Sequence, residues 1–140
     1  MMHYAQDSML ESFNCKKEDF VALPTGSGST GAIEKAMKIM SLQQDQKNKP
    51  PVYLTPYEHH SNILPWVEFY DRIQELAHDD LGCLLIDKIE QQLMADPSPE
   101  IILSCSAASN VTSTLTDVVG LNRIVSTSVF IQKMSGSTRK

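Results

Sequence analysis

Apolar residues follow two spacings along this chain, and the two spacings alternate. Short apolar runs bounded by turn-forming or charged residues predict buried strands at 20–23, 52–54 and 101–103. Apolar positions three or four residues apart predict helices over 4–13, 30–41, 84–94 and 117–124. Residues 63–77 fit both a helix and an edge strand, so that segment stays open. Strands that alternate with helices predict an α/β fold with a mostly parallel sheet.

The carboxyl-terminal segment 126–140 departs from this pattern. It is rich in Ser and Thr, with a short apolar patch at 129–131. No turn residues there prepare a fourth strand-and-helix repeat. We therefore predict that the folded unit spans 1–125 and that 126–140 is a divergent tail.

Composition limits the classes of partner. The 140 residues are 41% hydrophobic and 21% charged, as expected of one domain with an ordinary core. The net charge of −5 and the scattered Lys and Arg residues argue against nucleic acid and anionic membranes as partners. There is no apolar stretch of roughly 18 residues and no signal-like start, so we expect a cytoplasmic protein. Three cysteines without CxxC spacing predict neither a disulfide framework nor a metal site.

A glycine-rich turn, Gly26-Ser27-Gly28-Ser29-Thr30-Gly31, lies between a predicted strand and a predicted helix. Free N–H groups and the helix dipole bind anions at such a place, and the hydroxyls of Ser29 and Thr30 add donors. A phosphate site is therefore predicted at Gly28, Ser29 and Thr30. The turn also fits the dinucleotide pattern GxGxxG, but Thr55-Pro56 stands where an acidic residue would bind the ribose. A turn that only connects strand and helix is the alternative.

Two further polar segments follow predicted strands. Residues 58–66 contain the neighbouring His59 and His60, which would point in different directions on an extended chain, and this argues against a shared metal ion. One imidazole can instead stack on a planar heteroaromatic ligand. Residues 104–112 are mostly small, which lets a loop approach a ligand, and Asn110 offers an in-plane donor and acceptor. Taken singly, both segments also fit ordinary loops without a ligand.

Three sequence blocks together resemble one family. They are Thr25-Gly26-Ser27-Gly28-Ser29-Thr30-Gly31-Ala32-Ile33, Tyr57-Glu58-His59-His60-Ser61-Asn62-Ile63-Leu64-Pro65-Trp66, and Ser109-Asn110-Val111-Thr112 with Asp117-Val118. In order and spacing they are similar to the motifs of the class V aminotransferase and cysteine desulfurase family, pyridoxal 5'-phosphate (PLP) enzymes of fold type I. The resemblance covers 20–124. It implies the amino-terminal portion of the large domain, an incomplete three-layer α/β sandwich.

The resemblance also implies roles for the matched residues. Gly28, Ser29 and Thr30 match the positions that hold the PLP phosphate. His59 matches the histidine that stacks on the pyridine ring, and Asn110 matches the asparagine near the phenolic oxygen. The implied cofactor is PLP, which supplies the carbanion chemistry that protein groups tune. The family acts on small amino-acid-type substrates, and a homodimer is expected of the full-length form.

Parts of the family pattern are missing. After residue 124 there is no Asp-x-Ala segment, whose aspartate would pair with the pyridine nitrogen, and no lysine follows a histidine as the Schiff-base lysine does. The only later lysines are Lys133 and Lys140, in a tail that looks solvated. Ser113 stands where a glycine usually follows Asn-Val-Thr.

We therefore predict a truncated class V protein. Residues 1–125 form a partial PLP-binding large domain that keeps the cofactor-binding motifs and has no catalytic residue of its own. The alternatives are a non-catalytic phosphate- or PLP-binding module and a nucleotide-binding βαβ domain. A protein of this kind is expected to expose sheet edges and apolar surface, and therefore to be marginally stable.

Overall fold

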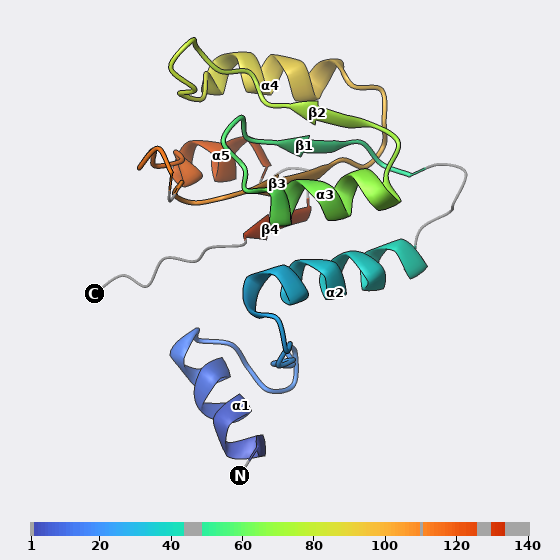
Figure 1. Ribbon diagram of the computed structural model, residues 1–140, viewed down its shortest axis with the longest axis vertical. Coiled ribbons are helices and arrows are strands. Elements are labelled where there is room, and N and C mark those ends of the chain that lie inside the picture. The colour runs from blue at the N-terminus through green and yellow to red at the C-terminus, as the bar shows by residue number, and fades with distance from the viewer. Residues whose placement is uncertain (1, 44–48, 110, 126–129, 134–140) are drawn as a thin grey trace.

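The computed structural model describes residues 2–43, 49–109, 111–125 and 130–133. The elements are, in chain order, α1 (Met2–Ser12), α2 (Gly28–Gln43), β1 (Val52–Leu54), α3 (His60–Phe69), β2 (Ile73–Glu75), α4 (Ile86–Ala95), β3 (Ile102–Cys105), α5 (Val118–Val125) and β4 (Phe130–Lys133). The strands form one sheet in the order β2-β1-β3-β4, and every pair is parallel (Figure 1). The predicted α/β fold with a parallel sheet is confirmed.

Helices cover both faces of the sheet because successive side chains of a strand point to opposite faces. Val52 and Leu54 of β1 pack against α2 and α3, whereas Tyr53 between them packs against α4 and α5. The first core contains Ile33, Met37, Val52, Leu54, Trp66, Tyr70 and Ile102, and the second contains Tyr53, Leu76, Ile89, Leu93, Leu103, Cys105 and Leu121. These two cores make a three-layer arrangement of helices, sheet and helices.

Most of the predicted elements are present, with their ends shifted by a few residues. The predicted helices at 4–13, 30–41, 84–94 and 117–124 correspond to α1, α2, α4 and α5, and the runs at 52–54 and 101–103 correspond to β1 and β3. The open segment 63–77 contains most of α3 and all of β2. Its spacing fitted both kinds of element because it contains both.

The strand predicted at 20–23 is wrong. This segment is part of the connection from α1 to α2, and Phe20 and Leu23 are 54% and 58% exposed. It lies outside the sheet, and the Ala22 carbonyl oxygen instead accepts a hydrogen bond from Gln6 Nε2 at 2.8 Å. A short apolar run becomes a strand only where a neighbouring strand can pair with it.

One strand, β4, lies within the segment 126–140. It pairs with β3 in a parallel register that runs from Ile102↔Phe130 to Cys105↔Lys133. The short apolar patch can form a strand there because β3 offers it an unpaired edge. Lys133 is therefore the last residue of β4, at the carboxyl edge of the sheet.

Helix α1 lies apart from the three layers (Figure 1). The chain turns after the helix at Asn14, whose φ of 54° is left-handed. Lys17 Nζ, beyond this turn, forms an ion pair of 2.9 Å with Asp7 Oδ2 of the helix. Neither this helix nor any other in the described residues is long and apolar enough to cross a membrane.

Candidate functional site

The glycine-rich turn is the start of helix α2. Gly28, the first residue of the helix, has a φ of 61°, a left-handed conformation that favours glycine. Thr25 Oγ1 donates a hydrogen bond of 3.2 Å to the Gly28 carbonyl oxygen. The N–H groups of Gly28, Ser29 and Thr30 lie in the first turn, where an α-helix has no acceptor for them. Ser29 and Thr30 are exposed and this turn has no acidic residue, so the turn can receive an anion.

His59 is the N-cap of helix α3. Its backbone is extended, with φ −72° and ψ 146°, and its Nδ1 accepts the Ser61 N–H at 3.1 Å. Ser61 Oγ also lies 2.9 Å from Nδ1. Because Nδ1 accepts, the proton of the neutral ring is on Nε2. The ring is exposed, and the His60 ring is 6.3 Å away at an interplanar angle of 72°.

Behind His59, a polar network joins the loop after β1 to α3 and to β3. Asn62 Oδ1 accepts hydrogen bonds from Trp66 Nε1 at 3.1 Å and from Ser104 Oγ at 2.9 Å, and Asn62 Nδ2 donates to Glu58. Glu58 also accepts from Ser106. Glu58, Asn62 and Ser106 were not among the site residues predicted from the sequence, although Glu58 and Asn62 lie in the second sequence block. The spacing of four between Glu58, Asn62 and Trp66, which places side chains on one face of a helix, was a signal for the first two.

The third segment contains a turn that hydrogen bonds from Thr116 and within residues 109–112 stabilise. The Ser106 carbonyl oxygen accepts from Thr116 Oγ1, which lies 3.1 Å from the Tyr57 hydroxyl. Burial raises the pKa of Tyr57 above its ordinary value. Ser109 Oγ accepts the Thr112 N–H at 3.2 Å. Asn110, the site residue predicted in this segment, lies outside the described residues.

The described parts of the three segments lie on the same side of the sheet. Helices α2 and α3 pack side by side and both begin on the side at which β1 ends (Figure 1). The hydrogen bonds between Glu58 and Ser106 join the second segment to the third. The structure therefore brings the glycine-rich turn, His59 and the start of the third segment to the carboxyl edge, the usual ligand edge of a parallel sheet.

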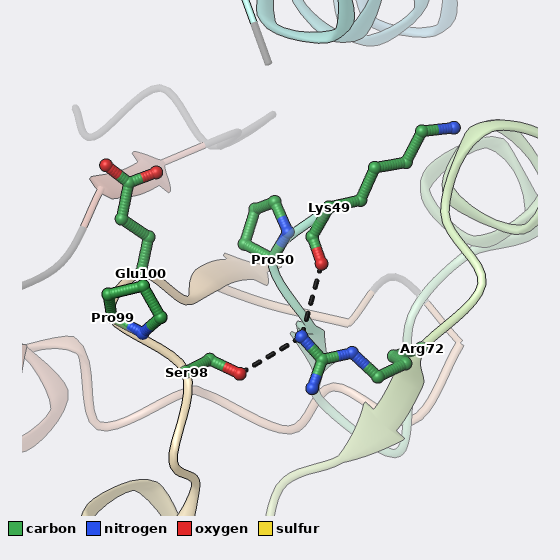
Figure 2. A pocket seen from close by; sticks show the side chains of 6 residues that line it. All are labelled: Lys49, Pro50, Arg72, Ser98, Pro99 and Glu100. Atoms are coloured by element: carbon green, nitrogen blue, oxygen red, sulfur yellow. Dashed lines mark hydrogen bonds between the residues drawn. The ribbon is translucent and has the colours of Figure 1, made fainter. Parts of the chain in front are cut away.

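A cavity of about 290 Å³ lies at the opposite edge, where the strands begin (Figure 2). It is lined by Lys49, Pro50, Arg72, Ser98, Pro99 and Glu100. One nitrogen of the Arg72 guanidinium donates to the Lys49 carbonyl oxygen at 3.2 Å and to Ser98 Oγ at 3.0 Å. Arg72 therefore ties together the segments that precede β1, β2 and β3.

A second tie at this amino edge connects β1 to the end of α4. The Tyr53 hydroxyl donates to Asp96 Oδ2 at 2.8 Å, and Asp96 Oδ1 accepts the Ser98 N–H at 2.9 Å. Burial and the bond to Asp96 raise the pKa of Tyr53 to about 12. The hydrogen bonds with Ser98 hold the pKa of Asp96 below its ordinary value. These polar groups form hydrogen bonds with one another and thereby hold the starts of the strands in place.

The fold is that of an α/β protein with a parallel sheet, and the glycine-rich helix start and His59 lie on the side at which its strands end. The family model "Aminotransferase class-V" matches residues 7–131. The chain belongs to the class V aminotransferase family, whose members depend on PLP. The family match extends beyond 20–124, the range of the resemblance seen in the sequence, at both ends.

Curated relatives agree with this assignment. The chain is 27% identical over 118 residues to the cysteine desulfurase SufS of Plasmodium falciparum, an alignment that covers 81% of this chain and 21% of that protein. It is 26% identical over 102 residues to a probable cysteine desulfurase of Borreliella burgdorferi, covering 70% of this chain and 24% of the relative. The chain thus spans about a fifth to a quarter of the length of these proteins.

Solved structures share the fold. A NifS-like protein superposes with a TM-score of 0.77 at 17% identity, over 99% of this chain and 37% of its own. The NifS-like protein of Rickettsia africae gives a TM-score of 0.60 at 16% identity, over 76% of this chain and 28% of its own. An aminotransferase of Leishmania mexicana gives the same TM-score at 18% identity, over 76% of this chain and 28% of its own. At these identities the likeness establishes the fold alone.

The residues at the carboxyl edge fit the cofactor of the family. A phosphate needs unpaired donors and open space, and a Cβ built on Gly26 or Gly28 would have no atom within 4 Å beyond its chain neighbours and the backbone of its own helix. A pyridine ring needs a flat surface, and the exposed imidazole of His59 provides one while Ser61 holds it. Both requirements are met at the starts of two helices that pack together.

Proposed function

We propose that this chain holds PLP at the carboxyl edge of its sheet. Gly28, Ser29 and Thr30 bind the phosphate, His59 stacks on the ring, and Asn110 lies near the phenolic oxygen. The observation that carries this proposal is that α2 and α3 begin on the same side of the sheet (Figure 1). The start of α2 offers free N–H groups for an anion, and the start of α3 offers an exposed imidazole. Membership of a PLP-dependent family supports the choice of ligand.

Each residue has one task in this proposal. When bound, PLP supplies an electron sink for carbanion chemistry. The first-turn amides of α2 and the hydroxyls of Ser29 and Thr30 neutralise the phosphate charge. Ser61 fixes the ring of His59, so that little side-chain entropy is lost on stacking. The amide of Asn110 can donate a hydrogen bond in the plane of the ring.

We further propose that these 140 residues bind the cofactor without turning over substrate. The motivating observation is that no lysine among them follows a histidine, as the Schiff-base lysine of the family does. The corresponding full-length form would act on an amino-acid-type substrate as a homodimer in the cytoplasm. The second candidate is a non-catalytic module that binds PLP or phosphate and is not part of an active enzyme. The retained glycine-rich turn and the absence of a lysine after a histidine favour it.

Titration of the purified chain with PLP, followed by the absorbance of the cofactor, tests the site. We expect saturable binding that inorganic phosphate competes away and that His59→Ala weakens about tenfold. His60→Ala is the matched control, because it removes the neighbouring exposed ring. Absence of saturable binding, or equal losses in the two variants, would contradict the assignment.

Borohydride reduction of the loaded chain tests the absence of catalysis. We expect no covalent adduct to form. A reduced adduct that maps to Lys133 or Lys140 would show a Schiff base and would contradict the non-catalytic assignment. Binding of a nicotinamide dinucleotide in place of PLP would favour the nucleotide-binding alternative.

A further inference from the structure

The carboxylate of Glu58 receives most of the hydrogen bonds that join the second and third segments of the site. Glu58 Oε1 accepts hydrogen bonds from Thr55 Oγ1 and from the Ser106 N–H, the latter at 2.6 Å. Its Oε2 accepts from Asn62 Nδ2 at 2.7 Å and from Ser106 Oγ at 2.6 Å. We infer that Glu58 is a positioning residue that sets the place of His59 relative to β3 and the third segment. This inference rests on the proposed function.

The number of donors explains why a carboxylate stands at this position. Four donors point at the two oxygens of Glu58, and an ionised carboxylate only accepts, with about four lone-pair sites. A glutamine of the same shape would present an NH₂ group to donors such as Asn62 Nδ2. Hydrogen bonds to an ionised acceptor are also about twice as strong as neutral ones. The network therefore loses more than one bond when the charge is removed.

The place of Glu58 in the chain links this network to the imidazole. His59 follows it directly and caps α3, and Asn62 lies in the first turn of that helix. The bonds of Glu58 to Ser106 fix this turn to the end of β3. Ser61 fixes the His59 ring only to the helix itself. Without Glu58 the ring would keep its place on α3, but the start of α3 would lose its hydrogen bonds to Ser106, and only the bond between Asn62 and Ser104 would still join its first turn to β3.

A double-mutant cycle tests whether Glu58 acts through His59. Glu58→Gln, His59→Ala and the double variant are titrated with PLP, and thermal unfolding confirms that each is folded. We expect Glu58→Gln to weaken binding about tenfold, and the double variant to bind no more weakly than His59→Ala alone. Glu68→Gln, an exposed carboxylate of α3, is the matched control and should bind like the unaltered chain. Unchanged affinity in Glu58→Gln, or additive losses in the double variant, would overturn the inference.

A second measurement does not depend on PLP. The ring ¹⁵N resonances of His59 are compared by NMR in the unaltered chain, in Glu58→Gln and in Ser106→Ala, which keeps the carboxylate and three of its four donors. We expect His59 to shift in both variants while His78, an exposed histidine in the loop after β2, does not. If Glu58→Gln does not fold, Ser106→Ala decides. If the unaltered chain binds no PLP, the proposed function fails, whereas unshifted His59 resonances would refute the positioning role by themselves.

Discussion

The two edges of the sheet each contain a hydrogen-bond network around one acidic residue, but the networks differ in what they leave open. At the amino edge, Asp96 accepts hydrogen bonds from Tyr53 and Ser98. One guanidinium nitrogen of Arg72 donates to Ser98 Oγ and to the Lys49 carbonyl oxygen (Figure 2). At the carboxyl edge, the network around Glu58 is satisfied inside, but an exposed imidazole and a helix start with unpaired amides lie beside it.

This difference separates polar groups that hold the fold from polar groups that can receive a ligand. A cavity alone does not identify a ligand-binding site. At the amino-edge cavity, the Arg72 nitrogen already donates to acceptors within the chain. Donors without an internal acceptor are the more informative sign. This criterion supports placing the proposed site at the carboxyl edge, even though the cavity of Figure 2 lies at the other edge.

Removing the centre of the carboxyl-edge network should have the largest effect on stability. Asn62→Ala leaves Trp66 Nε1 and Ser104 Oγ, both in buried side chains, without their acceptor. We expect the free energy of unfolding to fall by about 3 kcal/mol, the cost of unsatisfied buried donors. Urea unfolding followed by circular dichroism measures the change.

The matched change at the amino edge is Ser98→Ala, in a partly exposed network. We expect it to lower the free energy of unfolding by about 1 kcal/mol or less, because water can replace its hydroxyl. Asn122→Ala, which changes an exposed asparagine of α5, is the control for Asn62→Ala and should not change the free energy of unfolding. Equal losses in Asn62→Ala and Ser98→Ala would mean that the two networks do not differ in burial as described.

An effect of similar size is expected from Tyr53→Phe, which removes the hydroxyl that bonds to Asp96. The loss should be about 1 kcal/mol at neutral pH, with PLP affinity unchanged because the residue belongs to the amino edge. Tyr4→Phe, which removes an exposed hydroxyl, is the control. A loss of PLP affinity in Tyr53→Phe would break the separation of the two edges.

Alkaline pH gives an independent test of the Tyr53 hydroxyl, because its burial and, after that, its bond to Asp96 raise its pKa. Folding raises the pKa of Tyr53 from 10.0 to about 12, so the folded state favours the protonated hydroxyl. Its stabilising contribution is therefore complete below pH 10 and is lost as the pH rises from 10 to 12. Thermal unfolding of Tyr53→Phe should lack this decline relative to the unaltered chain. Parallel curves for the two proteins over this interval would count against the bond.

How far the sequence predicts the fold depends on whether an element is specified locally. The apolar spacing of α2 and the run of β1 are local signals, and both elements are found. The run at 20–23 and the patch at 129–131 have similar local signals, yet only the second forms a strand, because only it meets a free strand edge. Pairing between segments far apart in sequence decides such cases, and no local pattern reports it.

The site shows the same limit. Glycines at a helix start and a histidine after a strand were visible as residue types, and the structure brings them to one edge. The contact of Glu58 with Ser106 spans 48 positions, so it could not be predicted from spacing. The networks that hold the visible residues in place were therefore the part that sequence reasoning missed.

The smallest predicted effect tests the third segment of the carboxyl edge. Ser113 has a φ of 59°, a left-handed conformation that costs a residue with a Cβ about 1 kcal/mol and costs glycine little. Ser113→Gly should therefore raise the free energy of unfolding by about 0.5 kcal/mol, after the greater chain entropy of glycine is subtracted. Asn14→Gly is the control, because Asn14 has a φ of 54° but asparagine tolerates this conformation better. A gain at Asn14 that equals or exceeds the gain at Ser113 would show that the turn after Ser109 is not strained. If the gain at Ser113 is found without a change in PLP affinity, strain in this turn has no role in the site.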